Sequence, residues 1–135
     1  MDSSHSILSP QSPALPLADR IARVQESVAA AARRAGRSPD EVTIVAVCKT
    51  AERPAVDEAY RRGLRHFGEN RVQEAHAKWP ALKERHPDVE LHLIGPLQSN
   101  KVREAVALLD VIETVDRPKL ARALAEEISD RKSVV

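Results

Sequence analysis

The sequence predicts an α/β fold in which parallel strands alternate with helices. The chain has 135 residues, which is enough for one domain with a hydrophobic core. From residue 43 onward the apolar pattern alternates between strand and helix spacing, with the strand first in each of four units. The strand predicted at 43–48 is apolar on both faces, which is typical of a parallel sheet covered by helices.

Two segments precede the first strand. Residues 1–17 contain five serines and three prolines with few large apolar groups, so we expect a disordered tail there and a single folded domain over residues 18–135. Apolar residues then recur at helical spacing over residues 18–35, and Gly36 suits a left-handed helix end. An amphipathic helix is therefore predicted before the sheet.

The four predicted units follow this helix. Their strands are expected at 43–48, 64–67, 89–94 and 111–115, and their helices at 54–63, 70–79, 99–109 and from 116 onward. Pro80 is expected to kink or break the second helix, and Asn70 and Asp116 are candidate helix caps. Such units form either a doubly wound open sheet or part of a closed barrel, and the order of strands and helices alone does not distinguish these two folds. An eight-fold barrel needs about 250 residues, so this chain would hold its first half.

Composition narrows the class of protein. The formal net charge of +1 gives no electrostatic case for nucleic acid or an anionic membrane as partner. No apolar run approaches the roughly 20 residues that a membrane-spanning helix needs, and residues 1–17 lack the pattern of a secretion signal. Cys48 is the single cysteine, which excludes an internal disulfide and fits a reducing compartment. We therefore expect a cytoplasmic protein.

Lys49 is the first candidate site residue, because it directly follows the strand predicted at 43–48. A lysine at the carboxyl end of a parallel strand can present a primary amine at the mouth of an α/β fold, which suits imine formation with an aldehyde. The apolar strand end is expected to keep the amine out of water, which favours its neutral, nucleophilic form. The alternative, more frequent for lysines in general, is a side chain that reaches solvent or pairs with an acid.

Two further motifs follow the next strands. In the first, Asn70 offers a donor and an acceptor to a ligand, although it could equally cap the following helix. In the second, His92 lies on a strand that leads into a turn at 95–100, where Ser99 and its amide neighbours start a helix and could hold an anion or a polar ring substituent. Helix capping explains much of that turn without a ligand.

Other kinds of site have less support. The histidines stand at positions 5, 66, 76, 86 and 92, and no two have the spacing of metal ligands on a helix, so no metal site is predicted. The sequence contains neither a glycine-rich phosphate loop nor a nucleophile elbow.

Three ordered segments, 45–50, 67–74 and 92–101, closely resemble the pyridoxal phosphate homeostasis protein family, within a similarity that spans residues 17–128. The resemblance implies the first half of a (β/α)8 barrel of the alanine racemase N-terminal type, preceded by one helix. It also implies pyridoxal 5'-phosphate held as an imine on Lys49, with Asn70, His92 and Ser99 around the cofactor. Proteins of this family are monomers that carry or regulate vitamin B6 and amino-acid pools rather than act as catalysts, so the resemblance favours a non-catalytic role over an enzymatic one.

The chain also departs from this family. The family grips the cofactor phosphate with two glycine turns late in its sequence, and this chain stops before both. Losing three or four hydrogen bonds to a charged group would remove roughly 5 kcal/mol of binding energy. Two alternatives therefore stay open: a racemase-like enzyme that uses pyridoxal phosphate, and a half-barrel that binds no cofactor and self-associates through open sheet edges.

Overall fold

The computed structural model of the chain describes residues 15–134, which fall into two compact units divided between Val42 and Thr43. The tail expected at 1–17 lies almost wholly outside the described residues. The residues of the domain expected over 18–135 belong to both units, and each unit is described by itself below.

The first unit consists of helix α1 (Leu17–Arg34) and the short 3-10 helix η2 (Pro39–Glu41). Helix α1 confirms the amphipathic helix predicted before the sheet. It ends where expected, because Gly36 adopts a left-handed φ of 73° and the Arg37 N–H donates to the Ala32 carbonyl at 2.9 Å.

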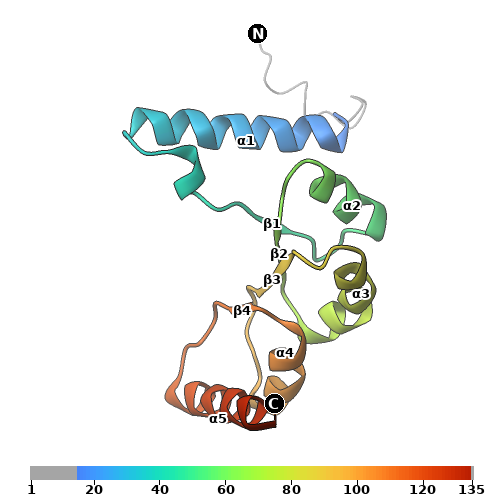
Figure 1. Cartoon of the computed structure of the whole chain (residues 1–135), viewed down its shortest axis with the longest axis vertical. Coiled ribbons are helices and arrows are strands. Elements are labelled where there is room, and N and C mark those ends of the chain that lie inside the picture. The colour runs from blue at the N-terminus through green and yellow to red at the C-terminus, as the bar shows by residue number, and fades with distance from the viewer. Residues whose placement is uncertain (1–14, 135) are drawn as a thin grey trace. The chain divides into compact units, whose positions relative to one another are not determined.

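The second unit contains four parallel strands in the order β1-β2-β3-β4, each followed by a helix (Figure 1). Its elements are β1 (Val45–Val47), α2 (Arg53–Arg61), β2 (His66–Glu69), α3 (Val72–Arg85), β3 (Glu90–Leu93), η3 (Ser99–Lys101), α4 (Val102–Leu108), β4 (Val111–Ile112) and α5 (Pro118–Val134). This architecture confirms the predicted fold class, four of the eight units of a (β/α)8 barrel.

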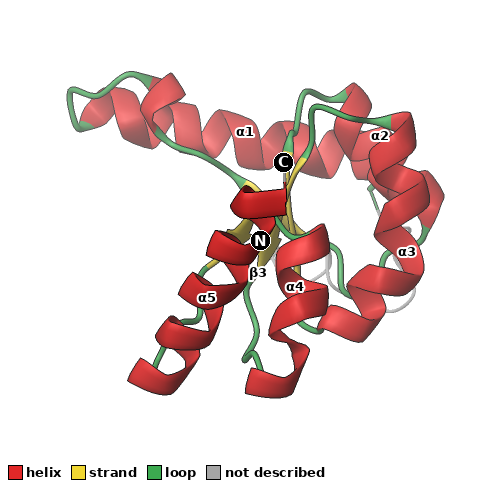
Figure 2. Ribbon diagram, turned by 60° about the horizontal axis from the view of Figure 1, so that its bottom comes forward, coloured by secondary structure: helices red, strands yellow, loops and turns green. Residues whose placement is uncertain are grey.

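The helices cover one face of the sheet and leave the other open. Figure 1 shows α2, α3 and α4 on the same side of the strands, and Figure 2 shows α2 to α5 following one another in an arc. Phe67, Leu91 and Leu93 point toward the helices and are fully buried. On the opposite face Val47 of the edge strand β1 is 54% exposed. The prediction that β1 is buried on both faces is therefore wrong, because within the second unit α2 to α5 supply cover on one side only.

Three local predictions are also corrected. Helix α3 continues through Pro80 to Arg85 instead of breaking, because Trp79 and Leu82 on either side of the proline are anchored in the core. Strand β2 extends to Glu69, and the residue that caps α3 is Arg71 rather than Asn70. Helix α5 starts at Pro118, two residues after Asp116, whose carboxylate accepts a hydrogen bond from Arg117.

Within residues 15–134, no helix has both the length and the apolar character that crossing a bilayer requires.

Candidate functional site

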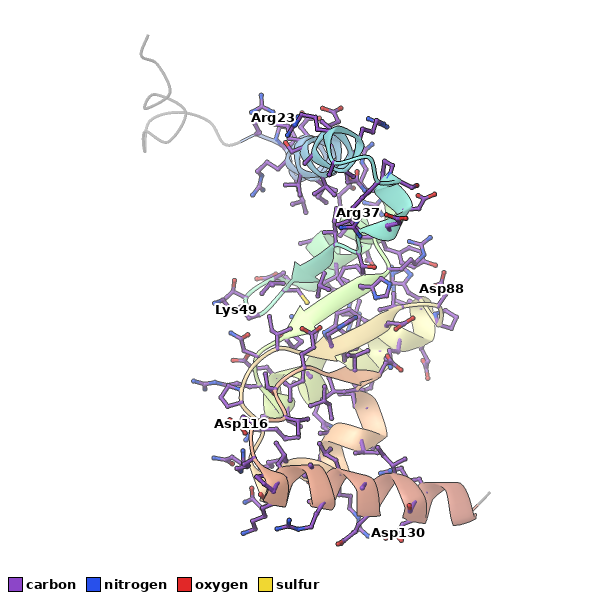
Figure 3. All side chains as sticks on the ribbon, turned by 90° about the vertical axis from the view of Figure 1, so that its left-hand side faces the viewer. Arg23, Arg37, Lys49, Asp88, Asp116 and Asp130 are labelled. Carbon is purple, nitrogen blue, oxygen red and sulfur yellow. The ribbon has the colours of Figure 1, made fainter. Side chains whose placement is uncertain are left out.

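The candidate site residues lie where the parallel strands end. Lys49 comes two residues after β1, Asn70 directly follows β2, and the segment from Ile94 follows β3. Figure 3 shows Lys49 and Asp116 on the side of the sheet where the strands have their carboxyl ends, and Asp88 on the opposite side. Loops at the carboxyl ends of parallel strands are where α/β proteins place their ligand sites.

Lys49 is exposed at this edge. The expectation that the strand end keeps its amine out of water is therefore not met, and the alternative of a side chain that reaches solvent describes the structure. The cause is the position of β1, which is an edge strand with one open face. An exposed primary amine is nevertheless accessible to a small aldehyde that enters from solvent.

The turn that carries Lys49 is fixed by a second lysine. Lys78 on α3 donates from its Nζ to the carbonyls of Cys48 and Ala51, on either side of the turn, the latter at 3.0 Å. The same Nζ lies 2.8 Å from the carboxylate of Glu69, which is fully buried. Lys78 therefore links the loop after β1 to the end of β2.

Glu69 is the centre of this buried cluster. Its Oε2 accepts hydrogen bonds from Trp79 Nε1 at 2.7 Å and from Cys48 Sγ at 3.2 Å, whereas its Oε1 has no partner among the described residues. Burial raises the pKa of the Cys48 thiol to about 12, and the nearby negative charge of Glu69 adds to this shift. Cys48 is thus a protonated core residue.

A cleft of about 960 Å³ lies at the carboxyl ends of β2 and β3. It is lined by Asn70, Arg71, Val72, Gln73, Glu74, Ile94, Gly95, Pro96, Leu97, Gln98 and Lys101. Asn70 thus contributes to the cleft, but Lys49, His92 and Ser99 are not part of its lining. Gly95 lets the two loops meet, because a Cβ there would lie 2.2 Å from the Asn70 carbonyl oxygen.

His92 is buried on the open face of the sheet, with 7% of its surface exposed. Its Nδ1 lies 2.6 Å from the carboxylate of Glu113, and its Nε2 lies 3.0 Å from Nδ1 of His66. With both nitrogens engaged, the imidazole is held in one orientation.

Ser99 takes part in a different set of hydrogen bonds, which lies between the loops after β3 and β4. Its Oγ accepts a hydrogen bond from Arg117 at 3.4 Å, and the same guanidinium donates to the Leu97 carbonyl at 2.9 Å. Thr114 donates to the Gly95 carbonyl at 2.7 Å. These bonds tie the loop after β4 to the loop after β3, and sequence analysis did not identify Arg117.

Sequence analysis also missed Lys78 and His66. Lys78 lies in the middle of a helix, where no local pattern marks it as a partner of the first loop. His66 and His92 come from neighbouring strands, so their proximity depends on the register of β2 and β3 and not on their spacing in the sequence.

No protein-family model matches the chain. Among curated proteins, the chain is 43% identical over 112 residues to the pyridoxal phosphate homeostasis protein of Escherichia coli K12, which covers 82% of this chain and 48% of that protein. The protein of the same name from Aquifex aeolicus is 39% identical over 113 residues, covering 84% and 47%. The chain is a half-length relative of the pyridoxal phosphate homeostasis proteins.

Solved structures agree with this relationship. PipY of Synechococcus elongatus is 40% identical, and the chain superimposes on it with TM-scores of 0.74 without and 0.70 with bound pyridoxal phosphate, covering 87% of this chain and about half of PipY. A protein of Bifidobacterium adolescentis described as unknown gives a TM-score of 0.80 at 34% identity. The resemblance to the pyridoxal phosphate homeostasis proteins that the sequence motifs indicated is confirmed.

Proposed function

We propose that this chain binds pyridoxal 5'-phosphate through Lys49 and takes part in vitamin B6 and amino-acid homeostasis. The observation that carries the proposal is the exposed Lys49 amine at the carboxyl edge of the sheet, in a turn that Lys78 fixes. The homologues named for pyridoxal phosphate homeostasis and the pyridoxal phosphate bound to PipY support it. A reducing, cytoplasmic location is part of the proposal and rests on the single thiol of Cys48.

The side chains at the edge fit this cofactor in part. A primary amine in its neutral form is the group that an aldehyde requires: its nitrogen adds to the aldehyde carbon, and water leaves as the imine forms. The amide of Asn70, which lines the cleft, suits polar ring substituents. For a phosphate the cleft offers Arg71 and Lys101.

We propose a holding role rather than catalysis. Bound pyridoxal phosphate supplies an electron sink for amino-acid chemistry, but moving an α-proton also needs an acid–base group poised beside it. The imidazole of His92 is a side chain of the kind that could act as this acid–base group. Both its nitrogens are already engaged, by Glu113 and His66. A racemase-like activity would require one of these contacts to break. Solvent deuterium exchange at the α-carbon of alanine, with cofactor present, separates the two functions.

The proposal is tested by trapping. The 135-residue chain is mixed with pyridoxal 5'-phosphate, the visible imine band is recorded, and the adduct is reduced with borohydride and located by peptide mass spectrometry. We expect one dominant modified lysine, Lys49, and loss of the band in Lys49→Ala. Lys119→Ala is the matched control, because Lys119 is also exposed but lies on α5.

Equal labelling of many lysines, or an unchanged band in Lys49→Ala, would contradict the proposal. The absence of an imine band in the wild type would favour the half-barrel that binds no cofactor. The affinity of the 135-residue chain is expected to be weaker than that of full-length relatives. The chain spans about half their length, and each charge-assisted hydrogen bond to a phosphate contributes about 1.5–3 kcal/mol.

A further inference from the structure

The open face of the sheet carries a cluster of metal-binding side chains from β2 and β3. In the sheet register His66 is paired with Glu90, and His92 follows two residues along β3. Side chains two apart on a strand, and those of paired residues on parallel neighbours, project from the same face. The ligand atoms of His66, Glu90 and His92 all lie within 4.8 Å of one another. We propose that these three residues form a binding site for Zn²⁺ or a similar divalent transition-metal ion.

The distance between the two imidazoles favours a shared metal ion. His66 Nδ1 and His92 Nε2 are 3.0 Å apart. Two nitrogens bound to a tetrahedral zinc ion at 2.0–2.1 Å are separated by about 3.3 Å. A small opening of this pair therefore brings the two nitrogens to the separation that a shared ion requires.

Glu113 prepares His92 for this role. An ionised carboxylate only accepts hydrogen bonds, so at 2.6 Å His92 Nδ1 carries the proton and Nε2 presents its lone pair toward His66. Metal-bound histidines typically donate their other N–H to a carboxylate in this way, which fixes the ring and increases its basicity. Glu113 thus acts as a positioning residue and does not contact the ion.

Binding requires one change at His66. In the pair as it stands, His66 Nδ1–H donates to His92 Nε2. When the ion takes both lone pairs, His66 carries its proton on Nε2 instead, and no proton is lost overall. The carboxylates of Glu90 and Glu113 then offset the charge of a divalent ion.

The ligand types select the class of ion. Two imidazoles and one carboxylate suit zinc and its neighbours, whereas Mg²⁺ and Ca²⁺ prefer sites made of oxygen alone. Three protein ligands leave a fourth tetrahedral position for water or for a small anionic ligand. Glu90 is exposed, so the ion can enter from the open face.

The metal site shares His92 with the function proposed above, but Lys49 is not one of its ligands, so the loss of the imine lysine leaves metal binding intact. The test uses the 135-residue chain without a histidine tag, stripped with a chelator and titrated with Zn²⁺ by calorimetry. Co²⁺ replaces Zn²⁺ for visible spectra that report tetrahedral geometry. We expect one equivalent bound, with tetrahedral cobalt bands, in the wild type and in Lys49→Ala alike.

Variants assign the ligands. Glu113→Gln is expected to weaken zinc binding by about 10–100-fold, the usual effect of losing a carboxylate partner of a ligand histidine. His66→Ala and Glu90→Gln remove ligands and should weaken it by at least about 100-fold. Glu90 is exposed, so its variant keeps the result interpretable if His66→Ala fails to fold.

His76→Ala, which changes an exposed histidine on α3, is the matched control and should leave the affinity unchanged. Cys48 is a poor competitor, because burial raises the pKa of its thiol to about 12. One-equivalent binding that persists at wild-type affinity in Glu90→Gln and His66→Ala would overturn the proposal. So would a wild-type chain that shows no saturable binding or no tetrahedral cobalt spectrum.

Discussion

At the scale of single residues, the carboxyl edge of the sheet is organised by a buried ion pair. Glu69 is fully buried and depends on Lys78 for its counter-charge, and Lys78 in turn binds the carbonyls around the turn of Lys49. Because taking charges out of water is costly, such a pair adds little net stability and mainly fixes the positions of the groups it joins. Removing one partner leaves an uncompensated charge in the core. The position of the candidate imine lysine therefore depends on a side chain from a different element.

Lys78→Met is expected to lower the free energy of unfolding by about 3–5 kcal/mol, because it leaves the Glu69 carboxylate buried without its partner. Urea denaturation measures this loss. Lys83→Met is the matched control on the same helix: Lys83 also binds a carboxylate and a backbone carbonyl, but its pair with Asp110 is more exposed and is expected to contribute under about 1 kcal/mol. Equal small losses in both variants would show that the buried pair does not stabilise the fold.

Cys48 makes stability depend on alkaline pH. Burial, reinforced by the charge of Glu69, raises the pKa of its thiol from 9.0 to about 12 in the folded chain. The unfolded chain loses this proton near pH 9, so the contribution of the buried thiol is complete below pH 9 and is lost as the pH rises toward 12.

We expect the free energy of unfolding to fall by about 1 kcal/mol between pH 9 and 10 from this group alone. Urea denaturation at the two pH values, in the wild type and in Cys48→Ala, measures the difference. The variant should lose less stability over this interval, and an identical loss in both proteins would argue against the raised thiol pKa.

At the scale of elements, what could be predicted from the sequence followed from local patterns. The helix before the sheet and the four strand–helix units were predictable because spacing of apolar residues and glycine stops such as Gly36 and Gly63 act within a few residues. Strand ends were less well predicted, since a strand such as Val111–Ile112 is defined by its partner. The continuation of α3 through Pro80 depends on core packing that no local pattern reports.

In the candidate site, too, the features set by local sequence could be predicted and those set by tertiary packing could not. Lys49, Asn70 and Ser99 stood out because each follows a predicted strand, and His92 because its strand leads into the turn at 95–100. The exposure of Lys49 depends on what covers β1, and the pairing of His66 with His92 depends on sheet register. Lys78 reaches the first loop from a helix that begins more than twenty residues later in the chain. Contacts of this kind arise only once the chain has folded.

Pro80 offers a test of the balance between propensity and packing in α3. A proline inside a helix costs about 3 kcal/mol relative to alanine, partly offset by about 0.4–1 kcal/mol from the stiffer unfolded chain. Pro80 is exposed, so Pro80→Ala should disturb no core contact and restore the hydrogen bond to the His76 carbonyl. We expect a gain of about 2 kcal/mol by urea denaturation. Pro118→Ala, in the first turn of α5 where proline is tolerated, should change little, and similar effects of the two variants would contradict this account.

At the scale of the whole molecule, the sheet has two unpaired edges and one open face. Among the described residues, β1 pairs only with β2, and β4 pairs only with β3. In a closed (β/α)8 barrel both edges are paired and the inner face is filled by layers of side chains. Here the inner face carries the half-exposed Val47 together with the His66–Glu90–His92 cluster. Unpaired strand edges beside apolar side chains favour pairing with another chain.

The 135-residue chain is therefore expected to self-associate in solution, with β1 and β4 as the contact edges. Sedimentation velocity over a range of concentrations should show a monomer in exchange with larger species. Val47→Lys places a charge on the edge strand and should weaken association by at least about tenfold, or about 1.4 kcal/mol. Val24→Lys is the matched control, because Val24 on α1 is exposed to a similar degree, 51% against 54%, but lies outside the sheet. A wild-type chain that stays monomeric at all concentrations would show that the open edges are protected in another way, and equal effects of the two lysines would assign association to surface charge rather than to strand pairing.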